Sequence, residues 1–361
     1  MPKYFKTEIK ISKKAIQKNI SIFRNLLDKK TKLMAVVKSN AYGHGILTIP
    51  KLVEKNVDWF GVDSMAEAKT LRDQKIKKPI LVFGYTFPSL YKEAEKLDIS
   101  LSFYNFEERK ILKKYPNLKV HIKIDTGMHR QGVYVEDLDS FLKSIDKNQI
   151  EGIYTHFAGA KDPKFKPYTL MQISNFNKAI EITSNFTKSF LKHACSTSAT
   201  IHYSDCHFDM VRIGAGIYGL GLSSSDNMGT VPIMSWESIV AQVKKVRKDF
   251  YIGYNLTEKA KEEKFVAVIP IGYWHGFGRN LSSIGEVLVR GHRAKVLGIV
   301  SMDVIVVGFK KGFIPKVGER VVIIGKSGKD KITVREIGKK TGTVDSEIVT
   351  RINPLIPRKL V

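Results

Sequence analysis

The sequence predicts an α/β + β fold class, a (β/α)8 TIM-type barrel followed by a C-terminal all-β domain. The main observation is a regular series of short apolar strand candidates, most of them separated by amphipathic helical segments. Eight such strands over about 200 residues are typical of a closed parallel barrel. The candidates lie at 33–37, 58–62, 79–83, 99–103, 119–124, 150–155, 190–195 and 209–213.

A doubly wound open sheet is the competing arrangement, because it also alternates strands and helices. Its dinucleotide-binding form carries Gly-x-Gly-x-x-Gly directly after the first strand. Residues 38–45 read Lys-Ser-Asn-Ala-Tyr-Gly-His-Gly, which does not match that motif. The closed barrel is therefore favoured.

The chain enters the barrel through a strand and a helix. Residues 5–11 alternate like a half-buried strand, and Ser12 is placed to cap a helix whose apolar face runs from Ile16 to Leu27. Further helices are expected at 65–71 and 171–190.

The pattern changes near residue 228, where short strands crowd together with glycine turns and helical periodicity becomes scarce. Strands are expected at 238–246, 265–271, 286–289, 294–299, 304–309 and 320–324, with a helix at 333–340. The polar stretch 223–230 is the expected linker. We therefore predict a barrel domain at 11–228 and a β domain at 229–361, with an N-terminal strand at 4–11 packed on the second.

The net charge is the most unusual feature of the composition. The 361 residues carry a formal charge of +25, from 60 Lys+Arg against 35 Asp+Glu. Nucleic-acid binding is one hypothesis for such a charge. However, the lysines are scattered in ones and twos and no arginine-rich run occurs. A lysine-rich solvated surface is favoured, and no nucleic-acid partner is expected.

The cysteines and the apolar runs bear on localisation. Only Cys195 and Cys206 occur, at a spacing that matches no zinc or redox motif, and so few thiols are typical of a reduced cytoplasmic protein. The first residues lack the apolar core of a signal peptide, and no run approaches the roughly 18 apolar residues of a membrane-spanning helix. We expect a cytoplasmic protein without a membrane partner or a metal.

Lys38 is the most informative residue for function. It follows an apolar strand, and an ammonium at the end of a buried strand is costly to desolvate. A desolvated lysine loses its proton more easily, which Schiff-base chemistry with a carbonyl requires. The alternative is a lysine whose head simply reaches solvent at the strand end.

Other reactive side chains follow other predicted strands. Lys123 and Arg130 flank the end of the fifth strand, His156 follows the sixth, and Arg212 ends the eighth. Catalytic groups of such barrels gather at the carboxyl ends of the strands. We therefore expect these residues to meet on one face of the barrel, although a structural histidine or a solvated arginine would explain each one taken alone.

Two glycine- and hydroxyl-rich segments suit a phosphate. Gly214, Ala215 and Gly216 allow backbone N–H groups to approach an anion, and Ser196 and Thr197 follow the seventh strand. The hydroxyls could equally cap a helix. Loops after strands seven and eight are nevertheless the usual phosphate site of these barrels.

The segment from Lys38 to Gly45 resembles the pyridoxal 5'-phosphate (PLP) lysine segment of alanine racemases, and the resemblance covers nearly the whole chain. It implies that Lys38 carries the cofactor and that the Tyr42 hydroxyl lies on its phosphate side. It implies Lys123 as a lysine that the family often carbamylates, which would hold Arg130 near the substrate carboxylate. His156 would lie beside the cofactor, and Arg212 would contact its pyridine nitrogen.

The resemblance extends to the β domain. It implies Tyr254 as the second acid/base opposite Lys38, the Met302 backbone as a donor to the substrate carboxylate, and supporting roles for Asp303 and Tyr273. In that family these residues come from the other subunit of a homodimer. The implied activity is two-base racemisation of alanine, which supplies D-alanine for peptidoglycan.

The sequence departs from the family pattern at four places. Ser196-Thr197 stands where Asn-Ser is usual, Pro354 where a tyrosine is usual, Ile299 where an arginine is common, and His275 where an aspartate is common. They lie in or near the entrance and phosphate region, so we expect a roomier pocket. One alternative is a racemase of broader specificity that also accepts serine.

Two other classes share part of this architecture. A non-catalytic PLP-homeostasis protein would share the barrel and the lysine, but such proteins lack the β domain. A barrel decarboxylase would carry a carboxylate at the position of Arg212, which argues against that class.

Overall fold

The computed structural model describes residues 5–221, 226 and 228–361. The chain divides into two compact units, one formed by residues 16–41 and 46–231 and the other by residues 1–15, 42–45 and 232–361. Residues 223–225 and 227 of the predicted linker, and residue 4 of the predicted N-terminal strand, lie outside the described residues.

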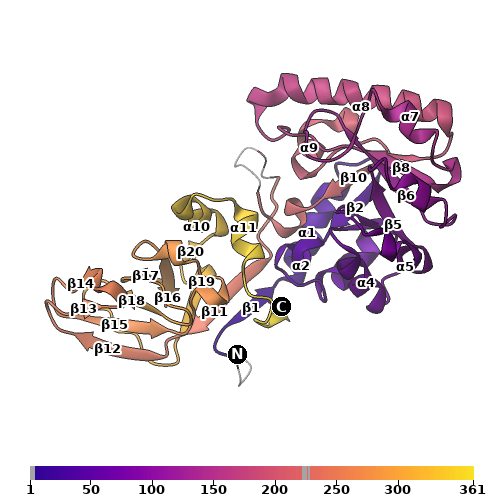
Figure 1. The fold of residues 1–361 in the computed structure, drawn as a ribbon. Helices are drawn as coiled ribbons and strands as arrows, with labels where there is room; N and C mark the ends of the chain where they lie inside the picture. The colour runs from indigo at the N-terminus through magenta and orange to yellow at the C-terminus, as the bar shows by residue number, and fades with distance from the viewer. Residues whose placement is uncertain (1–4, 222–225, 227) are drawn as a thin grey trace. The chain divides into compact units, whose positions relative to one another are not determined.

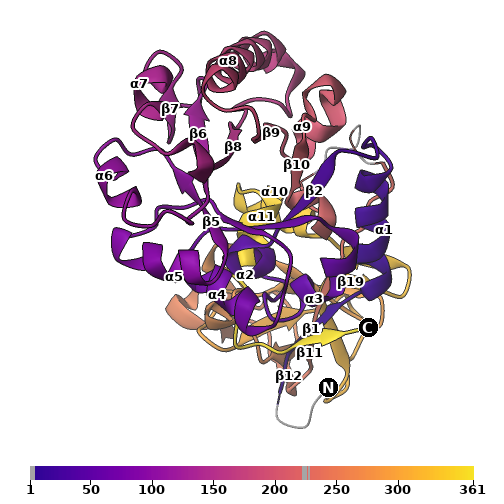
Figure 2. The same cartoon turned by 90° about the vertical axis from the view of Figure 1, so that its right-hand side faces the viewer.

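The first unit is a nearly closed parallel barrel, so the predicted fold is confirmed (Figure 2). Eight strands follow the order β10-β2-β3-β4-β5-β6-β8-β9, and a parallel bridge between Ser196 and Arg212 joins the two ends of that path. The strands are β2 (Lys32–Val36), β3 (Trp59–Val62), β4 (Ile80–Val82), β5 (Ile99–Phe103), β6 (Val120–Asp125), β8 (Ile150–Tyr154), β9 (Leu191–His193) and β10 (Met210–Ile213), with β7 (Val133–Tyr134) beside β6.

The barrel strands are short and buried, as their continuous apolar runs predict. Met34, Trp59, Leu81 and Met210 come from four different strands and pack in one cluster. The interior is not wholly apolar, however, because buried histidines and an arginine lie among these side chains.

Helices surround the barrel strands in Figure 2. Ser12 begins the first of them, where its Oγ accepts the Ala15 N–H at 3.2 Å, as predicted. The longest begins at Lys166, earlier than predicted, because Pro167 suits a first helical turn. The barrel helices are α1 (Lys13–Arg24), α2 (Lys38–Tyr42), α3 (Ile49–Val53), α4 (Met65–Asp73), α5 (Tyr91–Lys96), α6 (Arg109–Leu112), α7 (Leu138–Leu142), α8 (Lys166–Phe186) and α9 (Thr197–His202). Among the described residues, no helix has both the length and the apolar character to cross a membrane.

The second unit is built on a mostly antiparallel sheet in the order β12-β15-β18-β17-β16-β19-β11-β1-β21, with β20 paired to β19 (Figure 1). The predicted strand at 238–246 is two strands, which separate at Val240 and Ala241. The bounds are β1 (Glu8–Ile11), β11 (Met234–Ile239), β12 (Gln242–Val246), β15 (Lys264–Ile269), β16 (Glu286–Val289), β17 (His292–Val296), β18 (Ile305–Gly308), β19 (Arg320–Ser327), β20 (Asp330–Ile332) and β21 (Arg358–Leu360).

Short elements complete this unit. The hairpin strands β13 (Tyr251–Ile252) and β14 (Glu258–Lys259) hold residues 253–257 between them. The helix α10 (Val334–Thr341) is capped by Thr333, whose side chain accepts the Glu336 N–H, and lies where a helix was predicted. The helix α11 (Asp345–Thr350) was not predicted.

Leu81 tests the packing of the barrel. Its side chain is fully buried, so Leu81→Ala should lower the free energy of unfolding by about 2–5 kcal/mol through lost burial and the cavity that remains. Leu47→Ala is the matched control, since Leu47 is 65% exposed and should change the same quantity by less than about 0.5 kcal/mol. Chemical denaturation of both variants gives the comparison, and equal losses would contradict this account of the core.

Candidate active site

Five cationic or titratable side chains follow the barrel strands at their carboxyl ends, as predicted: Lys38 after β2, Lys123 in β6, Arg130 in the loop after β6, His156 after β8 and Arg212 in β10. They lie close enough to influence one another, because the charges of Arg212, Arg130, Lys123 and Lys38 all lower the pKa of His156. The structure therefore brings these five residues to one mouth of the barrel.

Lys38 begins an unusual left-handed turn. The next four residues, Ser39 to Tyr42, all have positive φ angles between 52° and 55°. Each such residue costs roughly 1–2 kcal/mol relative to a right-handed conformation. Four in succession persist only where the surroundings determine the backbone.

Glu67 supplies much of that constraint. One carboxylate oxygen accepts the Asn40 N–H at 3.2 Å, and the other accepts the Asp63 N–H at 2.9 Å. The Asn40 side chain in turn accepts the Ile46 N–H at 2.8 Å. The turn that carries Lys38 is thus tied to the start of α4 by a carboxylate that bridges two backbone groups.

The environment of Lys38 is not the desolvated one that its position after an apolar strand predicted. Its side chain is 37% exposed and its Nζ lies 3.3 Å from a carboxylate oxygen of Asp63. The ammonium is therefore neither fully buried nor isolated, and desolvation is not its distinguishing property. Its distinguishing property is position, because the strained turn holds it at the strand end.

Lys123 is buried more deeply than Lys38. Burial, reinforced by the positive charges of Arg130, Arg212 and Lys38, lowers the pKa of Lys123 to about 8. Its Nζ donates to Gln131 at 2.9 Å, whereas Arg130 is exposed. A substantial fraction of Lys123 is a neutral amine near pH 8, which is the form that reacts with carbon dioxide.

Arg212 is 4% exposed, and three backbone carbonyls hold its guanidinium. Nη1 donates to the His193 carbonyl at 2.9 Å, and Nη2 donates to the carbonyls of Thr155 at 2.7 Å and Ala194 at 2.9 Å. Nη1 also lies 3.0 Å from the His193 Nδ1. Burial lowers the pKa of Arg212 to about 10, so it remains charged at neutral pH. Within the described part of the chain, no acceptor lies at hydrogen-bonding distance from its Nε–H.

His156 is neutral beside this cation. Burial and the charge of Arg212 lower its pKa to about 3. Its Nδ1 lies 3.5 Å from the Arg212 Nη2. A neutral imidazole that accepts at Nδ1 has its proton on Nε2.

Thr197 organises the segment predicted to hold a phosphate. Its Oγ1 accepts the N–H groups of Gly214 at 3.2 Å and Gly216 at 3.3 Å. Both lone pairs of the hydroxyl are then used, and its proton remains available to an anion. Glycine is required at 216, since an added Cβ would lie 2.4 Å from the Phe23 ring. Ser196 precedes α9, but its side chain makes no capping hydrogen bond to that helix. Ala215 is the first residue of a 3₁₀ turn, and this turn also has no side-chain cap.

Tyr42 and the residues predicted in the β domain belong to the second unit. Burial raises the pKa of the Tyr42 hydroxyl, which stays protonated. Tyr254 is 65% exposed and follows Gly253, whose φ is 78°. Met302 and Asp303 are also exposed, and the Ser301 and Met302 carbonyls accept the N–H groups of Tyr273 and Trp274, both at 3.1 Å.

Four residues near the site were not predicted from the sequence: Asp63, Glu67, His121 and His193. Asp63 directly follows a predicted strand, and that position was a signal for it. His121 lies two residues before Lys123 in the same strand, so the two side chains share a face. Glu67 and His193 carried no local signal.

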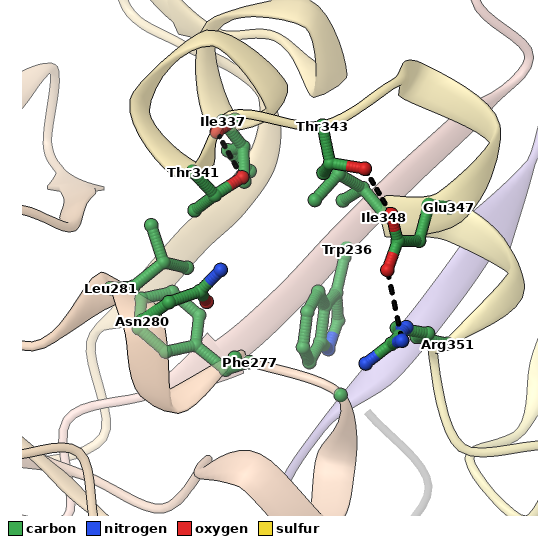
Figure 3. Close-up of a pocket in the computed structure, with 12 residues that line it drawn as sticks. Trp236, Phe277, Asn280, Leu281, Ile337, Thr341, Thr343, Glu347, Ile348 and Arg351 are labelled. Carbon is green, nitrogen blue, oxygen red and sulfur yellow. Dashed lines mark hydrogen bonds and ion pairs between the residues drawn. The ribbon is translucent and has the colours of Figure 1, made fainter.

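A pocket lies wholly within the second unit (Figure 3) and is small, with a cavity volume of about 60 Å³. Glu347 lies between Thr343, which donates to it, and Arg351, which pairs with it at 2.9 Å. None of the residues predicted to carry chemistry lines this pocket.

Two family models match the chain. The alanine racemase N-terminal domain matches residues 11–221, and the alanine racemase C-terminal domain matches residues 233–360. An alanine racemase of Leptospira interrogans is 36% identical over 98% of this chain and 95% of its own length.

Solved structures agree with these matches. An alanine racemase from Bacillus anthracis with bound L-Ala-P has a TM-score of 0.94 at 30% identity, over 100% of this chain and 96% of that one. A histidine racemase from Leuconostoc mesenteroides has a TM-score of 0.88 at 26% identity, over 99% of each chain. Fold and relatives define an amino-acid racemase, which confirms the predicted class of enzyme. The chain belongs to the alanine racemase family.

The role of Thr197 can be measured directly. Thr197→Val removes the acceptor of two backbone N–H groups and should lower the free energy of unfolding by about 1–3 kcal/mol. Thr197→Ser keeps the hydroxyl and should retain most of that free energy. Denaturation of the two variants provides the test, and equal stability of Val and Ser variants would show that the hydroxyl does not organise the segment.

Proposed function

We propose that this enzyme interconverts L-alanine and D-alanine with PLP as its cofactor, using Lys38 and Tyr254 as two bases, and supplies D-alanine for peptidoglycan. The observation that carries the proposal is Arg212, a buried cation whose terminal N–H groups are already bonded while its Nε–H is not. The Arg212 Nε–H could therefore donate a hydrogen bond to a single acceptor atom, such as the ring nitrogen of a bound heterocycle. The alanine racemase relatives supply the substrate.

The residues present fit PLP. Thr197, Gly214 and Ala215, together with Ser196 and Tyr42, would hold its phosphate through hydroxyl and backbone donors. Lys38 would hold its carbonyl carbon, and Arg212 would donate Nε–H to its pyridine nitrogen. When bound, PLP withdraws electrons from the substrate Cα and so makes its proton removable.

Arg212 sets how strongly the electrons are withdrawn. Its pKa, although lowered to about 10, keeps it protonated at neutral pH, so it donates a hydrogen bond without transferring a proton. The pyridine nitrogen therefore remains neutral, which favours plain proton exchange over other reactions at Cα. His156, neutral at this pH, accepts from the Arg212 Nη2 without adding charge.

Racemisation needs two bases on opposite faces of Cα. The Lys38 Nζ, free once the substrate has displaced it, would move a proton on one face, and the Tyr254 hydroxyl would move a proton on the other. Arg130 and the Met302 N–H would hold the substrate carboxylate. Carbamylated Lys123 would carry a negative charge and hold Arg130, with Asp303 and Tyr273 in support.

A homodimer with shared active sites would unite the two groups of residues. Its support is the exposure of large side chains in the second unit, including Tyr254 at 65%, Leu256 at 63% and Met302 at 52%. A contact with a second subunit would cover these large side chains, as interfaces commonly do. Cys195 and Cys206 are free and buried, which supports the cytoplasm as the site of action.

Lys38→Ala tests the cofactor. The variant should lose the visible absorption band of lysine-bound pyridoxal and all measurable racemase activity, because the proposal assigns that bond to the Lys38 Nζ. Lys13→Ala, at an exposed lysine, should keep both. An intact band in the Lys38 variant would mean that another lysine binds the cofactor.

Tyr254→Phe tests the second base. The variant should keep the absorption band and lose activity by roughly 10²–10⁴-fold, the usual range for a lost acid/base group. The loss should be greater in the direction where the tyrosine removes the proton. Chiral chromatography from each enantiomer measures both rates, and wild-type rates in both directions would contradict the two-base scheme.

Mixed dimers supply the control for the shared site. Refolding Lys38→Ala with Tyr254→Phe chains produces hybrids with one site that lacks both residues and one intact site. Activity should therefore return on mixing. Continued inactivity would place both bases in one chain.

Substrate range tests the entrance. Pro354 and Ile299 should leave room that a tyrosine and an arginine would fill, so L-serine should be racemised with a measurable kcat/KM below that for L-alanine. Comparison of L-alanine, L-serine, L-lysine and L-histidine gives the profile. Exclusive preference for alanine would contradict the roomier pocket.

A further inference from the structure

A row of polar side chains, buried except at its far end, leads from Arg212 across the barrel interior. The Arg212 Nη1 lies 3.0 Å from the His193 Nδ1, the His193 Nε2 lies 2.9 Å from the His121 Nδ1, and the His121 Nε2 lies 3.3 Å from a carboxylate oxygen of Glu151. Interiors of such barrels are ordinarily layers of branched apolar side chains. Four polar residues in continuous contact are therefore unusual in a barrel interior, and their presence needs an explanation.

The chemistry of the groups fixes every proton in this row. A carboxylate only accepts, so the His121 Nε2 carries the proton that Glu151 accepts, and the His121 Nδ1 is left as an acceptor. That acceptor requires the proton of His193 to lie on Nε2, which leaves the His193 Nδ1 as an acceptor. A guanidinium only donates, so Arg212 completes the row consistently.

Packing holds both rings in these orientations. His121 and His193 are fully buried. His193 stacks on Tyr154 with centroids 4.9 Å apart and planes 7° apart, and His121 meets the edge of Trp59 at 5.3 Å. These contacts fix the plane of each ring, and the hydrogen bonds of the row select which edge of the ring faces each neighbour.

The electrostatic state of the row is also consistent. Burial and the charge of Arg212 hold the pKa of His193 well below its usual value, so the ring is neutral. Burial alone would raise the pKa of Glu151, but hydrogen bonds from His121 and Ser100 lower it overall, so the carboxylate is ionised. Glu151 also reaches solvent, since its side chain is 30% exposed.

We propose that Glu151 is a positioning residue for Arg212, which acts by fixing the tautomers of His121 and His193. With the opposite tautomer, the His193 Nδ1–H would face an N–H of Arg212, and the guanidinium would lose an acceptor and shift. The alignment of its Nε–H toward a ring nitrogen would shift with it. The effect on a bound ring rests on the proposed function, whereas the assignment of the histidine tautomers does not depend on it.

The experiment combines imidazole NMR with kinetics on the PLP-loaded enzyme labelled with ¹⁵N-histidine. Wild type should show His121 and His193 as Nε2–H tautomers. Glu151→Leu should abolish the fixed tautomer of His193 as well as that of His121, and should lower kcat by about 10–100-fold, the range for lost support of a site residue, with a smaller change in KM. Glu151→Gln retains an acceptor oxygen and should restore most of both readouts.

Two further variants separate this role from general stability. Ser100→Ala removes another hydrogen bond to the same carboxylate and should leave the His193 tautomer and kcat near wild type. His121→Phe keeps a ring against Trp59 but breaks the row, so it should reproduce the effect of Glu151→Leu if that variant fails to fold.

Either of two outcomes would overturn the proposal. The first is a His193 tautomer that stays fixed in both Glu151→Leu and His121→Phe. The second is loss of the fixed His193 tautomer with no change in kcat. The NMR measurement does not require racemase activity. If the proposed function is wrong, the wild-type protein will show no racemisation, but its histidine tautomers will still be those assigned here.

Discussion

The charge of Arg212 is the constraint on which the barrel mouth depends. A buried cation is costly unless polar groups replace its hydration. The barrel supplies carbonyls of Thr155, His193 and Ala194, and no carboxylate among the described residues contacts the guanidinium directly. Carbonyls solvate the guanidinium without neutralising it, so its field extends to its neighbours. The low pKa of His156 and the lowered pKa of Lys123 both follow in part from that field.

An excess of positive charge makes the strand ends suited to anions. Lys38, Lys123 and Arg130 add to the charge of Arg212. Asp63, which pairs with Lys38 at a contact more than one-third exposed on each side, and Asp125, which raises the pKa of Lys123, offset only part of it. A ligand with a phosphate and a carboxylate brings the negative charge that this arrangement lacks. The same excess disfavours protonation of His156, which keeps its ring available as an acceptor.

The sequence predicted the barrel strands well because each is a continuous apolar run between polar segments. It also placed Lys38, His156 and Arg212 at strand ends, since that requires only the strand positions. The left-handed turn could not be predicted, because Ser, Asn, Ala and Tyr have no shared preference for positive φ. Nor could the contact of His121 with His193, which lie 72 residues apart. Such contacts follow from strand order and register, and local patterns do not determine either.

In the second unit, strand β1 lies between β11 and β21. Thr7 binds the carbonyl of Glu237, 230 residues away, and Ile9 pairs with Arg358. On the ribosome, β1 therefore emerges long before either partner exists, whereas most barrel strands pair with a strand that is made soon before or after them, the pairing of β2 with β10 being the exception. The order of synthesis separates an early-forming barrel from a late-forming sheet. During that interval the apolar residues Ile9 and Ile11 have no sheet to join, and the chain is then most exposed to chaperones and to aggregation.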